Sequence, residues 1–250
     1  MLFQSPPYTR YDLNFNLGGI PIRVHPLFWL ISLLFGISSG DPIQLVIWIA
    51  AVFVSVLIHE LGHALAMRLY GQPSQIVLYA AGGLTIPGQV RWGGDWANVS
   101  LTPNQEIFIS LAGPGAGFLL AVLIVAGSVA AGGSILITAL FSFIPFPMIV
   151  FPAASQIVNS IVMTFLWVNI FWGLINLLPV YPLDGGNVTR RILLSADPWN
   201  GVRKSLWVSV IAGGIVAVLC LILMRSLYMA FLFGLLAYQS YQTLKGRGLY

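Results

Sequence analysis

Long apolar segments that carry almost no charge are the feature that most constrains this chain. Hydrophobic residues make up 58% of the 250 residues, and charged residues make up only 7%. A soluble domain carries about 25% charged residues, because its surface must be solvated. The sequence therefore predicts a polytopic membrane protein, and it excludes a disordered or disulfide-stapled chain.

The few charged residues are informative because of where they lie. The net charge of +4 comes from 11 basic and seven acidic side chains, and no basic stripe is present that could bind nucleic acid. The lone Cys220 lies in an apolar run and can form no internal disulfide. Among the acidic residues, only Glu60 lies inside an apolar segment, between His59 and His63. A carboxylate in such a segment needs a chemical explanation.

Six apolar segments are candidates for helices that cross about 30 Å of hydrocarbon. They are Val24–Ser39, Ile43–Leu69, Glu106–Ala131, Ser155–Leu178, Lys204–Met224 and Leu227–Leu244. Residues 1–22 are polar to mixed and lack the pattern of a signal peptide. After the second segment, Gln75–Tyr79 and Leu84–Ile86 flank Ala-Ala-Gly-Gly and predict a small β-hairpin. The expected fold is an all-α polytopic membrane protein with about six transmembrane helices and a small hairpin after helix 2.

The apolar segment 132–154 decides between six and seven spans, and glycines and prolines interrupt it. With six spans and a cytoplasmic N-terminus, ten of the eleven basic residues lie on the inner side, as the positive-inside rule requires. These ten are Arg10, Arg23, Arg68, Arg91, Arg190, Arg191, Arg203, Lys204, Lys245 and Arg247. We therefore interpret 132–154 as a re-entrant or outer-surface apolar element. A seventh span stays open, because neighbouring helices can satisfy the backbone around a proline.

The second predicted span contains an H-E-x-x-H motif, His59-Glu60-Leu61-Gly62-His63. Residues four apart lie on one face of a helix, so the two imidazoles can share one zinc ion at about 2.0–2.1 Å. Glu60 is rotated by about 100° from His59 and can accept a proton from a zinc-bound water. Gly62 is expected to leave space beside the metal. Two of the three histidines of the chain fall in this motif, which favours a functional site over a chance match.

A catalytic zinc site needs a third protein ligand and an open fourth position. His25 is one candidate, but a histidine at the start of a span is unremarkable. Asp184 is the better candidate, because it follows the fourth span in the proline- and glycine-rich segment Asn176–Gly186. Taken alone, Asp184 is better explained as a turn or N-cap residue before a short helix at 187–194. Six spans place Asp184 on the same side as the two histidines, whereas seven spans place it on the opposite side.

These motifs resemble those of the site-2 protease family of intramembrane zinc metalloproteases, in a compact form without a PDZ or CBS domain. The resemblance covers about residues 20–245 and rests on two specific motifs and two weaker ones. They are His59–Ala64 in a membrane helix, Asn176–Pro179 followed by Pro182–Gly186, the turn Ala112-Gly113-Pro114, and the pair Gly82-Gly83.

The resemblance implies roles for the residues at the matching positions. His59, His63 and Asp184 are implied to bind one zinc ion per chain, and Glu60 is implied to be the general acid/base. Asn176 is implied to position the substrate or to stabilise the oxyanion, with an interhelical hydrogen bond as its alternative role.

Two further groups of residues have a less specific interpretation. Gly82 and Gly83 are implied to belong to a membrane-associated edge strand that holds an unwound substrate. An ordinary hairpin turn explains this glycine pair equally well. Asn169 interrupts the fourth apolar segment, and we expect it to hydrogen-bond between helices.

The expected activity is that of an intramembrane zinc metalloprotease that hydrolyses transmembrane substrate proteins near the cytoplasmic face, in regulated intramembrane proteolysis. One alternative is a non-proteolytic membrane chaperone or scaffold that retains the metal site, and another is a metal transporter. We expect a single domain over residues 1–250, with residues 1–22 cytoplasmic, in a multi-pass protein of the cell membrane with both termini in the cytoplasm. The expected partners are membrane-spanning protein substrates and the lipid bilayer. The sequence does not indicate the oligomeric state.

Overall fold

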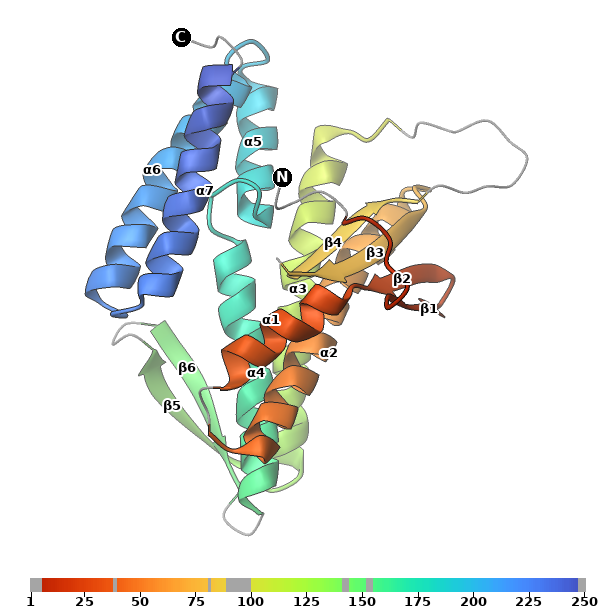
Figure 1. Ribbon diagram of the computed structural model, residues 1–250, viewed down its shortest axis with the longest axis vertical. Helices are drawn as coiled ribbons and strands as arrows, with labels where there is room; N and C mark the ends of the chain where they lie inside the picture. Colours follow the sequence, from red (N-terminus) through yellow and green to blue (C-terminus); the bar gives the residue numbers. More distant parts are fainter. Residues whose placement is uncertain are drawn as a thin grey trace. The chain divides into compact units, whose positions relative to one another are not determined.

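The computed structural model describes residues 6–37, 40–80, 82–88, 100–140, 144–151 and 155–246. Arg91, Arg247 and residues 141–143 and 152–154 of segment 132–154 therefore lie outside the described residues. The helices are α1 (Pro26–Gly36), α2 (Pro42–Leu69), α3 (Pro103–Ala130), α4 (Gln156–Asn176), α5 (Asp184–Ala196), α6 (Gly201–Ile222) and α7 (Leu227–Gly246) (Figure 1). The strands are β1 (Leu13–Leu17), β2 (Ile20–Val24), β3 (Ser74–Tyr79), β4 (Gly82–Pro87), β5 (Ser134–Leu140) and β6 (Ile144–Val150).

The chain divides into two compact units. Unit 1 consists of Met1–Ser100, Ala112–Thr138 and Pro145–Gly173, and unit 2 consists of Leu101–Leu111, Ala139–Ile144 and Leu174–Tyr250. Unit 1 holds the H-E-x-x-H motif and the larger sheet. In unit 2, α6 packs against both α5 and α7. Gly213 of α6 allows this close packing, because a Cβ at this position would lie 3.1 Å from the Cβ of Ala237 on α7.

Among the described residues, four helices are long and apolar enough to cross a membrane: α2, α3, α4 and α6. They correspond to the second, third, fourth and fifth of the six predicted segments. Helix α1 has only 11 residues, and its length of about 17 Å is well short of the hydrocarbon thickness. The four helices agree with a polytopic membrane protein, whereas the count of six spans stays a prediction.

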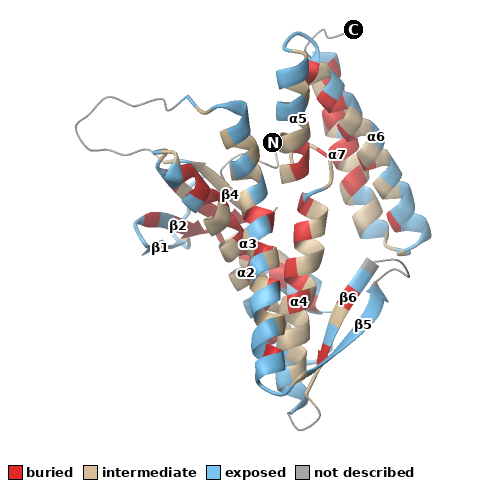
Figure 2. Cartoon of the chain, turned by 180° about the vertical axis from the view of Figure 1, so that it is seen from behind, coloured by how far each residue is buried: buried red, intermediate tan, exposed pale blue. Residues whose placement is uncertain are grey.

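Helix α2 buries a regular stripe, although its sequence is apolar almost all round. Its start is fixed by the Asp41 carboxylate, which accepts a hydrogen bond from the Ile43 main-chain N–H at 2.9 Å. The buried residues at four-residue steps are Ile47, Ala51, Ser55, His59, His63 and Met67. Large apolar side chains such as Val46 and Leu65 are exposed. Figure 2 shows that the helices of the chain carry both buried and exposed residues. Small and polar residues are buried in this way when the surroundings are lipid, because the apolar residues then need no protein cover.

Strands β3 and β4 lie where the sequence predicts a hairpin, but they belong to a larger sheet. The strand order is β1-β2-β3-β4, with β2 parallel to β3 and the other pairs antiparallel. The prediction of an all-α fold was therefore incomplete, because it missed the N-terminal hairpin. The sequence did carry the signal: Leu13–Leu17 alternates apolar and polar residues, and Gly18 and Gly19 follow with positive φ values of 59° and 85°.

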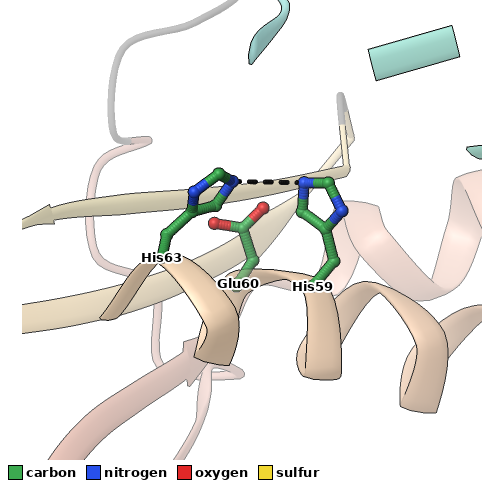
Figure 3. A group of neighbouring side chains, drawn as sticks. All are labelled: His59, Glu60 and His63. Carbon is green, nitrogen blue, oxygen red and sulfur yellow. Dashed lines mark hydrogen bonds between the residues drawn. The ribbon is translucent and has the colours of Figure 1, made fainter. Parts of the chain in front are cut away.

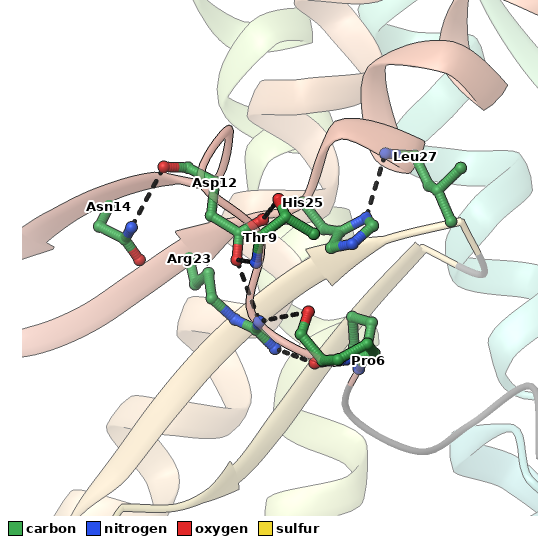
Figure 4. A network of polar contacts seen from close by, with 8 residues as sticks. Pro6, Thr9, Asp12, Asn14, Arg23, His25 and Leu27 are labelled. Carbon is green, nitrogen blue, oxygen red and sulfur yellow. Dashed lines mark hydrogen bonds and ion pairs between the residues drawn. The ribbon is translucent and has the colours of Figure 1, made fainter.

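Arg23 anchors the N-terminal segment to this sheet through a buried polar network (Figure 4). Its guanidinium donates to the main-chain oxygens of Pro6 and Pro7 at 2.8 and 3.3 Å and to the Asp12 carboxylate at 3.1 Å. Burial raises the pKa of Asp12, but hydrogen bonds from Thr9 and Arg23 outweigh this effect and hold the pKa below its usual value. Asp12 is thus charged and paired at neutral pH, and it fixes the entry of the chain into β1.

The described part of segment 132–154 forms a two-stranded hairpin, β5–β6, and contains no helix. A seventh helical span is therefore not supported. The end of β6 is fastened to α4, because the main-chain N–H of Phe151 donates to Asn159 Oδ1 at 2.9 Å and the Asn159 amide donates to the Phe151 oxygen at 3.3 Å. Its position at the outer surface stays a prediction.

Candidate active site

The three polar residues of the H-E-x-x-H motif form one buried cluster on α2 (Figure 3). His59, Glu60 and His63 are only 4%, 5% and 8% exposed. The two histidine rings turn their Nε2 atoms toward each other at 3.2 Å, and one potential ligand atom from each of the three residues lies within 4.8 Å of the others. The sequence prediction that the two imidazoles lie on one helix face agrees with this geometry.

The separation of the two imidazoles fits a shared metal ion. Two nitrogens bound to zinc at about 2.0–2.1 Å with a tetrahedral angle lie about 3.3–3.4 Å apart. The Nε2 atoms of His59 and His63 are 3.2 Å apart, so a small rotation of the rings admits the ion. Polar groups buried this deeply in an apolar helix need strong partners. The donor set therefore fits a zinc ion.

Helix α3 approaches α2 so closely at the cluster that both helices need glycine. A Cβ on Gly113 would lie 2.2 Å from His63 Nε2, the nitrogen on the metal side of the ring. A Cβ on Gly62 would lie 2.3 Å from the main-chain oxygen of Ala112. Gly62 was expected to leave space beside the metal, and this explanation was wrong, because its missing side chain makes room for the α3 backbone. Gly113 is the residue that keeps the metal side of His63 open.

Strand β4 covers the carboxylate of Glu60 from another side. The Thr85 hydroxyl donates to Glu60 Oε2 at 2.7 Å and lies 3.1 Å from the main-chain oxygen of Glu60. A Cβ on Gly83 would lie 2.4 Å from Glu60 Oε1. Residues two apart on a strand share a face, so Thr85 bonds one carboxylate oxygen while Gly83, without a side chain, makes room for the carboxylate against the strand. Sequence reasoning missed Thr85, because nothing in the sequence around it differs from an ordinary strand position.

The neighbouring ends of β3 and β4 complete this side of the site. Tyr79 is opposite Gly82 in the antiparallel register. Burial, together with the negative charge of Glu60, raises the pKa of Tyr79 to about 12, so its side chain remains a neutral phenol at physiological pH. Gly82 has a positive φ of 109°, and a Cβ on it would lie 2.8 Å from the Trp172 ring. Close packing alone therefore explains why both positions 82 and 83 are glycine.

The other candidate third ligand, His25, has a structural role. It is the N-cap residue of α1, and its Nδ1 accepts a hydrogen bond from the Leu27 main-chain N–H at 3.2 Å. A ring nitrogen used in this way stabilises the start of the helix. This observation favours a capping role for His25 over a ligand role.

Asn176 and Asp184 belong to unit 2, where a tight turn joins them. Asn176 is buried at the end of α4, and Asp184 is the first residue of α5, whose N-cap is Leu183. Asp184 is therefore not the N-cap, and the short helix expected at 187–194 begins earlier. A Cβ on Gly185 would lie 2.1 Å from the Leu177 oxygen, which explains the glycine. That Asp184 joins the two histidines at one metal stays a prediction.

Comparison with known proteins identifies the family. The model of Peptidase family M50 matches residues 47–223, which include the H-E-x-x-H motif, Asn176 and Asp184. The chain belongs to Peptidase family M50. The resemblance to site-2 proteases found in the sequence is thereby confirmed. The His-Glu-His cluster, which could hold a metal ion, agrees with a metalloprotease of this family.

Two curated relatives and one solved structure agree with this assignment. A zinc metalloprotease of Methanocaldococcus jannaschii is 25% identical over 87% of this chain and 58% of its own length. A predicted zinc metalloprotease of Synechocystis is 30% identical over 71% of this chain and 43% of its own length. This M50 chain thus spans about half the length of these relatives. The structure of a site-2 protease from Methanocaldococcus jannaschii shares the fold, with a TM-score of 0.57, 21% identity, and coverage of 93% of this chain and 94% of that chain.

Replacing Gly113 with alanine is expected to lower zinc affinity by about tenfold or more, because the new Cβ displaces the His63 ring from its metal-side position. Metal analysis of the purified protein, with competition by a chelator, measures this change. Gly115→Ala on the same helix is the control, since a Cβ at Gly115 meets nothing within 4 Å. Equal zinc affinity in the two variants would contradict the role given to Gly113.

Replacing Thr85 with valine is expected to lower kcat for peptide hydrolysis by about tenfold or more, because Glu60 loses a charge-assisted hydrogen bond of 2.7 Å. KM and zinc content should stay unchanged, since Thr85 offers no metal ligand. Thr85→Ser retains the hydroxyl and is expected to restore most of the rate. A serine variant as slow as the valine variant would show that packing, and not the hydrogen bond, is what matters.

Proposed function

We propose that this chain is a zinc endopeptidase that hydrolyses membrane-spanning substrate proteins near the cytoplasmic face of the cell membrane. The observation that carries the proposal is the buried cluster on α2. Two Nε2 atoms lie 3.2 Å apart, and a carboxylate beside them is held by Thr85 at 2.7 Å. Family membership supports a peptidase, and the four apolar helices support a membrane location.

The roles of the residues follow from their atoms. His59, His63 and Asp184 are proposed to hold one zinc ion, which when bound lowers the pKa of a water molecule and polarises the scissile carbonyl. Thr85 occupies Oε2 of Glu60, so Oε1 is the oxygen that accepts the proton of the attacking water. The protonated Glu60 then donates this proton to the nitrogen of the departing amine.

Asn176 is proposed to bind the substrate carbonyl. Its side-chain amide can donate a hydrogen bond to the oxygen on which negative charge develops. Asn176 is 9% exposed, and its place eight residues before Asp184 links the amide to the proposed ligand through one turn. This role belongs to the same proposal as the zinc ligation by Asp184 and depends on the two residues reaching one site.

The edge of β4 is proposed to hold the substrate in an extended conformation. A transmembrane helix hides its peptide bonds in internal hydrogen bonds, so it must unwind before hydrolysis. In the described sheet, β4 pairs with β3 on one side only, which leaves the main chain of Gly82–Pro87 available on the other side. A substrate strand added there would pass Gly83, which lies against the Glu60 carboxylate.

Two alternatives are less well supported. A metal transporter needs charged or histidine side chains along several helices, but within the described parts of the four candidate spans the buried side chains of this kind are His59, Glu60 and His63 alone, all on α2. A non-proteolytic chaperone or scaffold needs no ordered base, whereas Glu60 is held by the Thr85 hydroxyl. We propose a single transmembrane metalloprotease domain over residues 1–250 with both termini in the cytoplasm, in which β1 and β2 contribute to the sheet beside the site.

Replacing Glu60 with glutamine is expected to lower cleavage of a transmembrane substrate by about a hundredfold or more, the usual contribution of a general base. Zinc should be retained, because the two histidines are unchanged. The measurement is cleavage of a model substrate in liposomes by purified protein. Glu106→Gln is the control, since Glu106 pairs with the half-exposed Arg191 and contributes little. Unchanged cleavage by Glu60→Gln would refute the proposed mechanism.

Replacing Asp184 with alanine is expected to lower zinc affinity by about tenfold or more, because the ion loses a charged ligand. Metal analysis of the purified variant checks this expectation. Asp197→Ala in the same unit is the control, because that carboxylate forms an exposed ion pair with Lys204 at 2.8 Å. If the Asp184 and Asp197 variants bind zinc equally well, Asp184 is not a ligand.

A further inference from the structure

Asn169 on α4 carries a buried amide oxygen without a hydrogen-bond partner in the described part of the chain. The residue is 2% exposed. Its amide nitrogen donates to the Ser55 hydroxyl and to the Phe165 main-chain oxygen, both at 2.8 Å. These two bonds use both N–H protons and fix the orientation of the amide. The prediction of an interhelical hydrogen bond from Asn169 agrees with this contact, but Oδ1 still needs a donor that the described protein does not provide.

The oxygen faces a space left by a glycine on α3. A Cβ built on Gly117 would lie 3.6 Å from Asn169 Oδ1 and 3.7 Å from the Asn169 main-chain oxygen, and apart from its own helix backbone and chain neighbours no other atom of the described residues lies within 4 Å. Two acceptor oxygens thus border the space beside Gly117. A molecule with two O–H donors matches this pair of acceptors.

The position of the gap limits what can enter it. Ser55 belongs to the buried stripe of α2, four residues before His59, which is about 6 Å along the helix axis. Ser55 and Asn169 are both 2% exposed, so neither a lipid headgroup nor a substrate side chain can reach them from the surface. No charged side chain takes part in these contacts, which disfavours an ion. A small neutral donor is the ligand that fits.

We propose that Ser55, Asn169 and Gly117 form a binding site for one internal water molecule inside the membrane, one helical turn from His59. The water donates one hydrogen bond to Asn169 Oδ1 and satisfies an acceptor that would otherwise be buried unpaired. Since Ser55, which holds the Asn169 amide, lies on the same α2 stripe as the two histidines, the water is also close to a reaction that consumes one water per cycle. This second role rests on the proposed proteolytic function, whereas the site itself does not.

Gly117→Ala tests the site through the sign of its effect on stability. Alanine is the better helix former, and at 3.6 Å from Oδ1 its methyl makes an ordinary van der Waals contact. An empty gap therefore predicts that the substitution is neutral or raises Tm. A water site predicts that the methyl displaces the water, leaves Oδ1 unpaired and lowers Tm by a few degrees.

The experiment measures thermal unfolding of the full chain with zinc present, in detergent, for Gly117→Ala and for Gly115→Ala as the matched control. A Cβ at Gly115 meets nothing within 4 Å, so Gly115→Ala is expected to keep or raise Tm. A lower Tm for Gly117→Ala than for Gly115→Ala supports the proposal. A Tm that is equal or higher overturns it.

A second variant separates the loss of water from overpacking. In an Asn169→Leu background the amide oxygen is gone, so adding Gly117→Ala should no longer lower Tm. If the decrease persists in this background, sterics explain it and the proposal fails. These readouts need no proteolysis, so a failure of the water site is distinguishable from a failure of the proposed function, which Glu60→Gln tests separately.

Discussion

The close contact between α2 and α3 is the constraint on which the rest of the site depends. The two helices approach until a Cβ on Gly62 or Gly113 would overlap the other helix. At this distance the α3 backbone lies against one side of the cluster of His59, Glu60 and His63. Because residue 113 is a glycine, no side chain displaces the His63 ring. Between lipid-embedded helices, close backbone packing replaces the hydrophobic effect as the force that brings helices together. The same contact therefore contributes to assembling the fold and to shaping the site.

Much of the site could be predicted from the sequence because its chemistry is local. His59, Glu60 and His63 lie within five residues, and the geometry of a helix alone brings their side chains to one face. The apolar segments likewise predicted α2, α3, α4 and α6 within a few residues of their bounds. Helices in lipid must satisfy their own backbone, so composition alone is a strong guide to them.

The parts that escaped prediction depend on contacts between distant segments. Thr85 reaches Glu60 across 25 residues, and Gly62 packs against Ala112, which is 50 residues away. The pairing of β2 with β3 across two helices is also not local, so residues 1–22 were expected to be a polar segment without strands. Nothing in the sequence around Thr85 or Gly62 differs from an ordinary strand or helix position. Their partners become visible only when the helices and strands are placed.

The parallel pairing of β2 with β3 gives the N-terminus an influence on chemistry far along the chain. Strands β1 to β4 form one continuous hydrogen-bonded sheet between Asp12 and Thr85. Thr85 of the last strand donates a hydrogen bond to Glu60. Without β1 and β2, the remaining pair β3–β4 is a lone hairpin, which has little stability of its own. A change that displaces or removes β1 and β2, such as a bulky N-terminal tag or proteolytic trimming, is therefore expected to disturb the hydrogen bond from Thr85 to Glu60. It does so without altering α2, the helix that carries Glu60. Residues near the start of the chain thus affect the active site through the sheet.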